Sequence, residues 1–173
     1  SARRAVSLAP DDADAVLAFS HERQVAWDFK AARTAASHVT ELDPTSGWGL
    51  YRLFVLEAAF GNFDESVTAA RKASQLDPLT MGDLYPMALA YAGRFDEAMT
   101  AARAGLAIDS LSAVNCWWCV VMWVSAARGD VANTRLAQSR MAELRGSGRA
   151  RAYYDGIALA NAPVEFAQKI KIF

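Results

Sequence analysis

The chain has few of the residues that build most catalytic and metal sites. Its 173 residues include two cysteines and two histidines, and the histidines, His21 and His38, lie far along the sequence from the cysteines. A structural zinc site needs four Cys or His ligands. The motifs GxGxxG, GxxxxGK[ST], HExxH and GxSxG, which mark nucleotide, zinc and serine-nucleophile sites, are absent. We therefore expect no enzymatic activity, no metal and no cofactor.

The chain also lacks an excess of charge of one sign. Its 18 basic and 19 acidic side chains give a formal net charge of -1, and residues 128–173 carry only a weak basic excess. A nucleic-acid-binding domain concentrates Lys and Arg on one face. We therefore expect no direct contact with nucleic acid.

No apolar run is long enough to cross a membrane. The longest one that is nearly uncharged, residues 111–127, is interrupted by Ser112, Asn115 and Ser125, whereas a transmembrane helix needs about 20 predominantly apolar residues. The opening residues SARRAVSLAP lack the apolar core of a secretory signal. The two cysteines, which we expect to be free thiols, favour a reducing, cytoplasmic location.

What the chain does contain is an internal repeat. The segments ARRAVSLAP (2–10), ASHVTELDP (36–44), ARKASQLDP (70–78) and ARAGLAIDS (102–110) align without gaps, and their last residues are spaced 34, 34 and 32 apart. A second marker has the same period: AWDFKAA (26–32), FGNFDES (60–66) and AGRFDEA (92–98). A period of this length is typical of solenoids built from helical hairpins.

The residues of one unit explain the hairpin. Apolar residues between 45 and 60 recur at helical spacing, and Gly61 permits the left-handed turn that ends this helix. Asp64 and Glu65 then favour the positive end of a second helix, which Pro78 stops. In the next unit, Pro86 predicts a helix that begins near residue 83 or 84, so that the proline falls in its first turn. We expect Leu76, and likewise Leu8, Leu42 and Ile108, to be buried between hairpins.

With this period the chain resembles the tetratricopeptide repeat (TPR) family, whose helix-turn-helix unit has 34 residues. The resemblance is best in GNFDESVTAARKASQLDP (61–78) and GRFDEAMTAARAGLAIDS (93–110). It implies an all-α fold, a single right-handed solenoid of antiparallel helix pairs with about ten to eleven helices. The expected units are 1–10 (the end of an earlier hairpin), 11–44, 45–78, 79–110, 111–146 and a divergent or capping pair in 147–173.

The chain starts inside a hairpin, so we expect it to be a fragment of a longer protein. It resembles TPR arrays found downstream of bacterial winged-helix regulators and adenylate cyclases, which have a Trp-Asp pair at the first turn, here Trp27 and Asp28, followed by LDPL, here residues 76–79. The resemblance implies a bacterial signalling or regulatory role.

The segment NCWWCVVMWV (115–124) contains both cysteines and three tryptophans. We interpret it as part of the first helix of the fourth unit, residues 111–127, with most of its faces covered by neighbouring helices. A redox pair of the thioredoxin type would need a strand that leads into a helix, and no segment has the pattern of a strand. The favoured interpretation is therefore free thiols, buried or lining a groove, over a redox or metal site.

Function is then expected on the concave face that stacked hairpins create. The family pattern places the following residues there: Leu17, His21, Gln24, Trp48, Tyr51, Val55, Asp83, Met87, Tyr91, Cys116, Cys119 and Trp123. This surface is aromatic and rich in sulfur, which suits an apolar peptide or a helix. Members that bind chaperone tails have Lys and Asn at such places, so we do not expect chaperone C-termini as ligands.

The leading hypothesis is a non-catalytic module that binds a protein or peptide partner in this groove. The alternative is a ligand-sensing domain, in which the groove encloses a small apolar molecule; a closed pocket above about 300 Å³ would favour it. A homo-oligomer formed through the terminal repeats also remains open.

Overall fold

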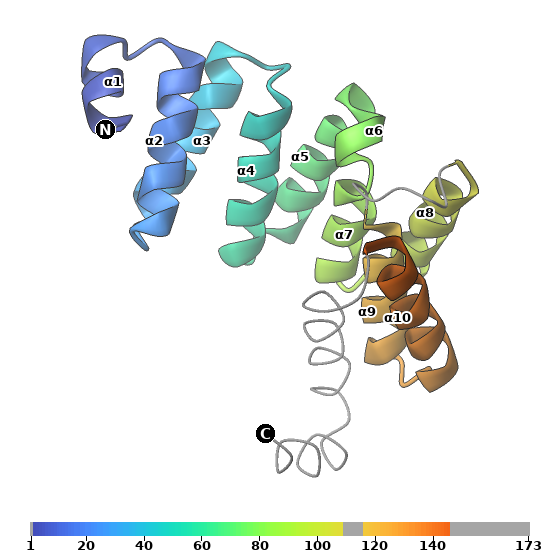
Figure 1. The fold of residues 1–173 in the computed structure, drawn as a ribbon. Helices are drawn as coiled ribbons and strands as arrows, with labels where there is room; N and C mark the ends of the chain where they lie inside the picture. Colours follow the sequence, from blue (N-terminus) through green and yellow to red (C-terminus); the bar gives the residue numbers. More distant parts are fainter. Residues whose placement is uncertain (1, 109–115, 146–173) are drawn as a thin grey trace. The chain divides into compact units, whose positions relative to one another are not determined.

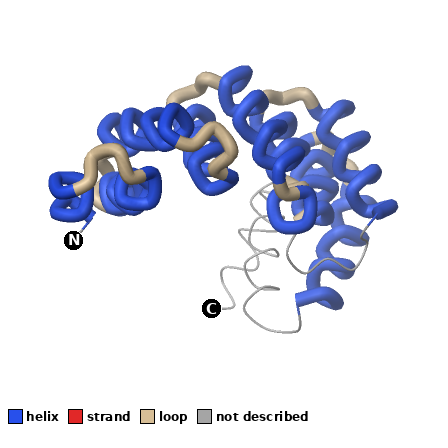
Figure 2. The backbone as a smooth tube through the Cα atoms, turned by 90° about the horizontal axis from the view of Figure 1, so that it is seen from above, coloured by secondary structure: helices blue, strands red, loops and turns tan. Residues whose placement is uncertain are grey.

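The computed structural model describes residues 2–108 and 116–145, which divide into two compact units between Ala92 and Gly93. Throughout these described residues every regular element is a helix and there is no strand, as predicted (Figures 1 and 2). The predicted units 1–10, 11–44 and 45–78 lie in the first compact unit. Residues 147–173, where we expected a capping pair, lie outside the described residues.

The first unit contains seven helices: α1 (Ala2–Leu8), α2 (Ala13–Val25), α3 (Phe29–Leu42), α4 (Gly47–Ala59), α5 (Phe63–Leu76), α6 (Pro78–Met81) and α7 (Leu84–Tyr91). The helices α2 and α3 pack as one hairpin and α4 and α5 as the next, while α4 also lies against α3, α2 and α7 (Figure 1). The described part of the second unit contains α8 (Phe95–Ile108), α9 (Trp117–Ala127) and α10 (Val131–Arg145), and α9 packs on both of its neighbours.

Local chemistry determines where the helices begin. The Asp12 carboxylate accepts a hydrogen bond from the Ala15 amide at 2.9 Å, and Ser46 caps α4 in the same way. In α7, Pro86 occupies the first turn, where its missing donor costs little, so the predicted start near residue 84 is confirmed. The preceding short helix α6 was not predicted.

Left-handed residues lie in the turns that follow α2, α4, α7 and α9. Gly61, Gly93 and Gly129 have φ of 80°, 72° and 71°, a conformation that glycine adopts without a steric penalty. The turn between α2 and α3 has Trp27 at the matching place, with φ of 61° and a side chain that is 81% exposed. A non-glycine residue costs about 1 to 2 kcal/mol in this conformation, so Trp27 is held there by its surroundings.

Small residues and two swapped hydrogen bonds bring the paired helices together. The Ser20 hydroxyl on α2 donates to the Ala32 carbonyl on α3 at 2.8 Å. In the next hairpin the Ser66 hydroxyl on α5 donates to the Phe54 carbonyl on α4 at 2.9 Å. Phe54 and Ser66 lie 34 residues after Ser20 and Ala32, so the two hairpins make the same contact with donor and acceptor exchanged between the helices. All four residues are almost fully buried.

The predicted burial of the apolar residue in the first repeat marker is wrong for Leu76, Leu8 and Ile108, whereas Leu42 is partly buried against the core of Val16, Ala35 and Val39. Leu76 is 45% exposed, and the corresponding Leu8 and Ile108 are 76% and 88% exposed. Within α5 the buried face consists of Ser66, Val67, Ala69, Ala70 and Ala73. The small residues therefore pack α5 against its neighbours, and the leucine at its last turn extends beyond this face.

Candidate functional site

The first helices of the repeats, α2, α4 and α7, share a surface that we call the first-helix face. Four aromatic rings on α4 and α7 form a connected aromatic array on it. Trp48 meets Tyr51 edge-on at 5.6 Å between ring centroids, Tyr51 meets Phe54 at 6.2 Å, and Phe54 stacks on Tyr91 at 5.9 Å with the ring planes 2° apart. Aromatic pairs in this distance range attract each other beyond their buried area.

The array is anchored at its centre and open at its ends. Phe54 is 1% exposed, whereas Trp48 is 61% and Tyr91 is 44% exposed. Phe54 contacts Tyr91 directly and Trp48 only through Tyr51. Rings that are restrained by such contacts lose less side-chain entropy when a partner covers them. Rigid, partly exposed aromatic residues are also the type of residue that dominates binding energy at protein interfaces.

Arg52 lies beside the array and connects α4 with α2. Its Nη1 donates to Oε1 of Gln24 at 2.6 Å and its Nη2 donates to Nδ1 of His21 at 2.7 Å. Its guanidinium also lies 5.9 Å from the ring centroid of Tyr51. Because a guanidinium has no acceptor atom, the Nδ1 of His21 must accept, which places the proton of the neutral ring on Nε2.

Arg52 forms no ion pair with any residue that the structure describes. The nearest acids along α2 and α4 are used elsewhere. Glu57 forms an ion pair with Arg33 at 2.7 Å. Glu22 accepts a hydrogen bond from Arg23, which lowers the pKa of that carboxyl. The cation on the first-helix face is therefore satisfied only by neutral groups of its own chain.

The structure brings some of the predicted groove residues together and separates others. His21, Trp48, Tyr51 and Tyr91 meet in the arrangement just described. Leu17 packs against the core formed by Val16, Ala35 and Val39. Val55 and Met87 are partly buried on α4 and α7. Gln24 holds Arg52, and Asp83 is the N-terminal boundary residue of α7, with 7% exposure.

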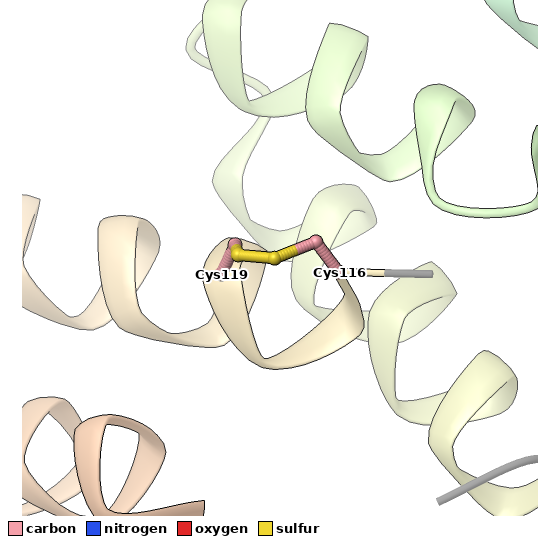
Figure 3. The surroundings of a disulfide bond; sticks show 2 residues. All are labelled: Cys116 and Cys119. Atoms are coloured by element: carbon pink, nitrogen blue, oxygen red, sulfur yellow. A yellow bond between two sulfur atoms is a disulfide. The ribbon is translucent and has the colours of Figure 1, made fainter. Parts of the chain in front are cut away.

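The expectation of two free thiols is wrong. Cys116 and Cys119 are joined by a disulfide, with their Cα atoms 5.1 Å apart (Figure 3). Cys116 is the N-terminal boundary residue of α9, so the helix expected over residues 111–127 begins, in its described part, at Trp117. Cys119 is 2% exposed, while Trp123 is partly buried one turn further along. Because the thiols are paired, they no longer support a reducing compartment.

Two residues of the site were missed by sequence reasoning. Phe54 was not assigned to the groove, yet it links Tyr51 to Tyr91. Arg52 was not assigned to the face at all. The sequence does contain a sign that Arg52 has another role. No acidic residue lies three or four positions from it on its own helix, so it cannot form an ion pair within that helix.

A separate hollow lies between α1, α2 and α3. It has a volume of about 510 Å³ and is lined mainly by Val6, Val16, Phe19, Ala31 and Ala35, with the polar Asp28, Lys30, Thr34 and His38 also contributing. This volume is within the range of small-molecule sites. The hollow includes none of the residues predicted for the groove.

Within residues 2–108 and 116–145, no group of three or more His, Cys, Asp or Glu side chains is placed to hold a metal ion. In the same residues no helix is both long enough and apolar enough to span a membrane.

Comparison with known proteins places the fold. No family model matches the chain, and no curated protein matches it either. Solved structures do: TTC0263, a thermophilic TPR protein of Thermus thermophilus, superposes with a TM-score of 0.72 at 14% identity over 92% of this chain and 87% of its own. YrrB, a TPR protein with an unusual peptide-binding site, gives 0.61 at 12% identity over 94% of this chain and 84% of its own. The chain therefore has a TPR-like fold.

A third similar structure is larger than this chain. An O-GlcNAc transferase from Thermobaculum terrenum superposes with a TM-score of 0.58 at 20% identity. The match covers 76% of this chain but only 26% of the transferase. At these identities the likeness concerns the fold alone.

Proposed function

We propose that the chain is a non-catalytic protein-interaction module that binds a segment of a partner protein on the first-helix face. The observation that carries the proposal is the aromatic array, in which the buried Phe54 contacts Tyr51 and the exposed Tyr91, and Tyr51 in turn contacts the exposed Trp48. YrrB, which shares the fold, is described as having a peptide-binding site, and this supports the same use of the fold here.

The test selects random peptides for binding to the immobilised protein. Each peptide is displayed as an insertion in a carrier protein, so that both of its ends are joined to the carrier. We expect a set of related peptides, and we expect Trp48→Ala to weaken their binding by about 2 kcal/mol, or roughly 30-fold, because loss of an aromatic anchor typically costs this much. Trp27→Asn is the matched control, since Trp27 is an exposed tryptophan outside the array. Recovery of no peptide, or equal loss in both variants, would refute the proposal.

We further propose that the module regulates or scaffolds a longer protein. The support is the resemblance to arrays downstream of bacterial winged-helix regulators and adenylate cyclases, carried by Trp27, Asp28 and residues 76–79. The complete reading frame tests it, because an adjoining DNA-binding or cyclase domain is the expected result.

Small-molecule sensing is a second candidate, favoured by the 510 Å³ hollow between α1, α2 and α3. An apolar fluorescent dye is expected to bind there and to be excluded by Ala31→Leu, which fills the hollow from α3. Dye binding that is unchanged in this variant would remove the hollow as a ligand site.

A further inference from the structure

The guanidinium of Arg52 is a positive charge that this chain leaves without a counter-ion in its described part. Its two side-chain hydrogen bonds, to Gln24 and His21, both go to neutral acceptors. A guanidinium has five N–H donors, so three remain for other partners. Arg52 is partly exposed, so a ligand can reach it.

The same two hydrogen bonds fix the side chain in place. Arg52 spans from α4 to α2, and the acceptors on α2 are one turn apart, at positions 21 and 24. An arginine held in this way loses less entropy when it binds an anion than one that moves freely in solvent. The fork of a guanidinium matches the two oxygens of a carboxylate.

Charge and apolar surface are adjacent on this face. Trp48 and Arg52 are four residues apart on α4, so both lie on one side of the helix. The Tyr51 ring contacts both the Trp48 ring and the Arg52 guanidinium. A ligand that satisfies both must place a carboxylate next to a large apolar side chain.

We propose that Arg52, held by Gln24 and His21, binds the side-chain carboxylate of an internal Asp or Glu in the partner segment, and that a neighbouring aromatic or aliphatic residue of that segment packs on Trp48 and Tyr51. This inference rests on the proposed function of the first-helix face. Trp48 lies one turn before Arg52 on α4, and the aromatic array continues past Arg52 through Phe54 to Tyr91 on α7. Apolar surface on both sides of the cation favours a segment that continues in both directions, and therefore an internal carboxylate over a chain terminus.

The chain offers a matched control for the charge of Arg52. Arg71 on α5 also has its guanidinium over a tyrosine, 4.8 Å from the ring centroid of Tyr85, and also donates to a neutral group, the Tyr85 hydroxyl at 2.9 Å. It is exposed on a second helix. Arg71→Gln therefore removes the same charge from α5, beside a tyrosine that is not part of the aromatic array.

The experiment selects the same random peptides, joined to the carrier protein at both ends, in parallel on the parent protein, Arg52→Gln and Arg71→Gln. Circular dichroism and thermal melting first establish that all three proteins are folded. We expect the parent and Arg71→Gln to enrich Asp or Glu beside aromatic or aliphatic residues. We expect Arg52→Gln to enrich the apolar residues alone.

Affinities of one selected peptide then measure the contact. Replacing its acidic residue by Gln or Asn is expected to weaken binding to the parent by about 10- to 100-fold, the range for hydrogen bonds to charged groups, and to have little effect on binding to Arg52→Gln. Selected peptides without an acidic residue, or acid-dependent binding that survives Arg52→Gln, would overturn the inference while leaving the proposed function in place. Peptides recovered only from a library with free C-termini would show that the carboxylate is terminal and overturn the internal assignment. Recovery of no peptide from any library would overturn both proposals.

Discussion

The ion pair between Arg33 and Glu57 gives the most informative test of how one hairpin is held to the next. Arg33 lies on α3 and Glu57 on α4, with 2.7 Å between Nε and Oε1. The Glu57 side chain is 9% exposed and that of Arg33 is 43% exposed. The side-chain hydrogen bond from Arg33 to Glu57, with the charge of Glu57, raises the pKa of Arg33.

The perturbation is Arg33→Met, which removes the cation but keeps an unbranched apolar side chain near Phe60, whose ring Arg33 covers at 5.3 Å. Glu57 would retain only its hydrogen bond from Asn62 at 2.6 Å. Removing one partner of a buried ion pair costs about 3 to 5 kcal/mol. Because Arg33 is 43% exposed, water can replace part of its interaction with Glu57. We therefore expect Arg33→Met to lower the free energy of unfolding by about 2 kcal/mol.

The assay is a double-mutant cycle of urea unfolding, followed by circular dichroism, on the parent protein, Arg33→Met, Glu57→Gln and the double variant. We expect the double variant to lose less free energy of unfolding than the sum of the losses in the two single variants. The difference, which is the coupling energy, should be about 1 to 2 kcal/mol. Equal slopes of unfolding free energy against urea would show that the four proteins unfold in the same way. A coupling energy below about 0.3 kcal/mol would refute the reasoning, since distant, independent sites add to within that margin.

Three further predictions concern single positions. Gly105→Ala should destabilise the protein by about 1 to 2 kcal/mol in thermal or urea unfolding, although alanine has the better helix propensity. The reason is that the new Cβ would lie 2.5 to 2.6 Å from ring atoms of the buried Trp117. An increase in stability would show that the ring can move freely. Trp27→Asn should raise the free energy of unfolding by about 1 kcal/mol, because Asn tolerates the left-handed turn better, and a loss of that size would mean that the indole makes contacts worth more than the strain. Hydrogen bonds from Thr80 hold the pKa of Asp77 below its usual value. The stability that the Asp77 charge contributes is therefore present above the unfolded pKa of about 4 and is lost as pH falls through the folded pKa. Asp77→Asn should have a lower melting temperature at pH 6 and a smaller drop in melting temperature on acidification, and an equal drop in both proteins would contradict this.

The elements that could be predicted are those determined by local backbone chemistry. Gly61 and Pro86 restrict or permit particular backbone angles wherever they occur, so the turn and the helix start were predictable from single residues. The short helix α6 was missed because Pro78, expected only to end α5, also begins the next helix at its first position, where a proline is equally suited.

The elements that could not be predicted depend on contacts between helices. Leu76 has the apolar character of a core residue, but its burial depends on which neighbours reach the last turn of α5. The contact of Arg52 with His21 joins residues 31 apart, and no spacing rule for a single helix covers it. Likewise, the spacing of Cys116 and Cys119 fits both free and paired thiols, and only the structure distinguishes them.

The exchanged serine hydrogen bonds have a consequence for building new arrays from this chain. Each hairpin has one hydroxyl at the contact between its helices, supplied by α2 in one hairpin and by α5 in the next. A chimaera that paired α2 with α5 would bring two hydroxyls to one buried contact, and one that paired α4 with α3 would have none. The two hairpins can therefore be shuffled as whole units, whereas their individual helices are matched pairs.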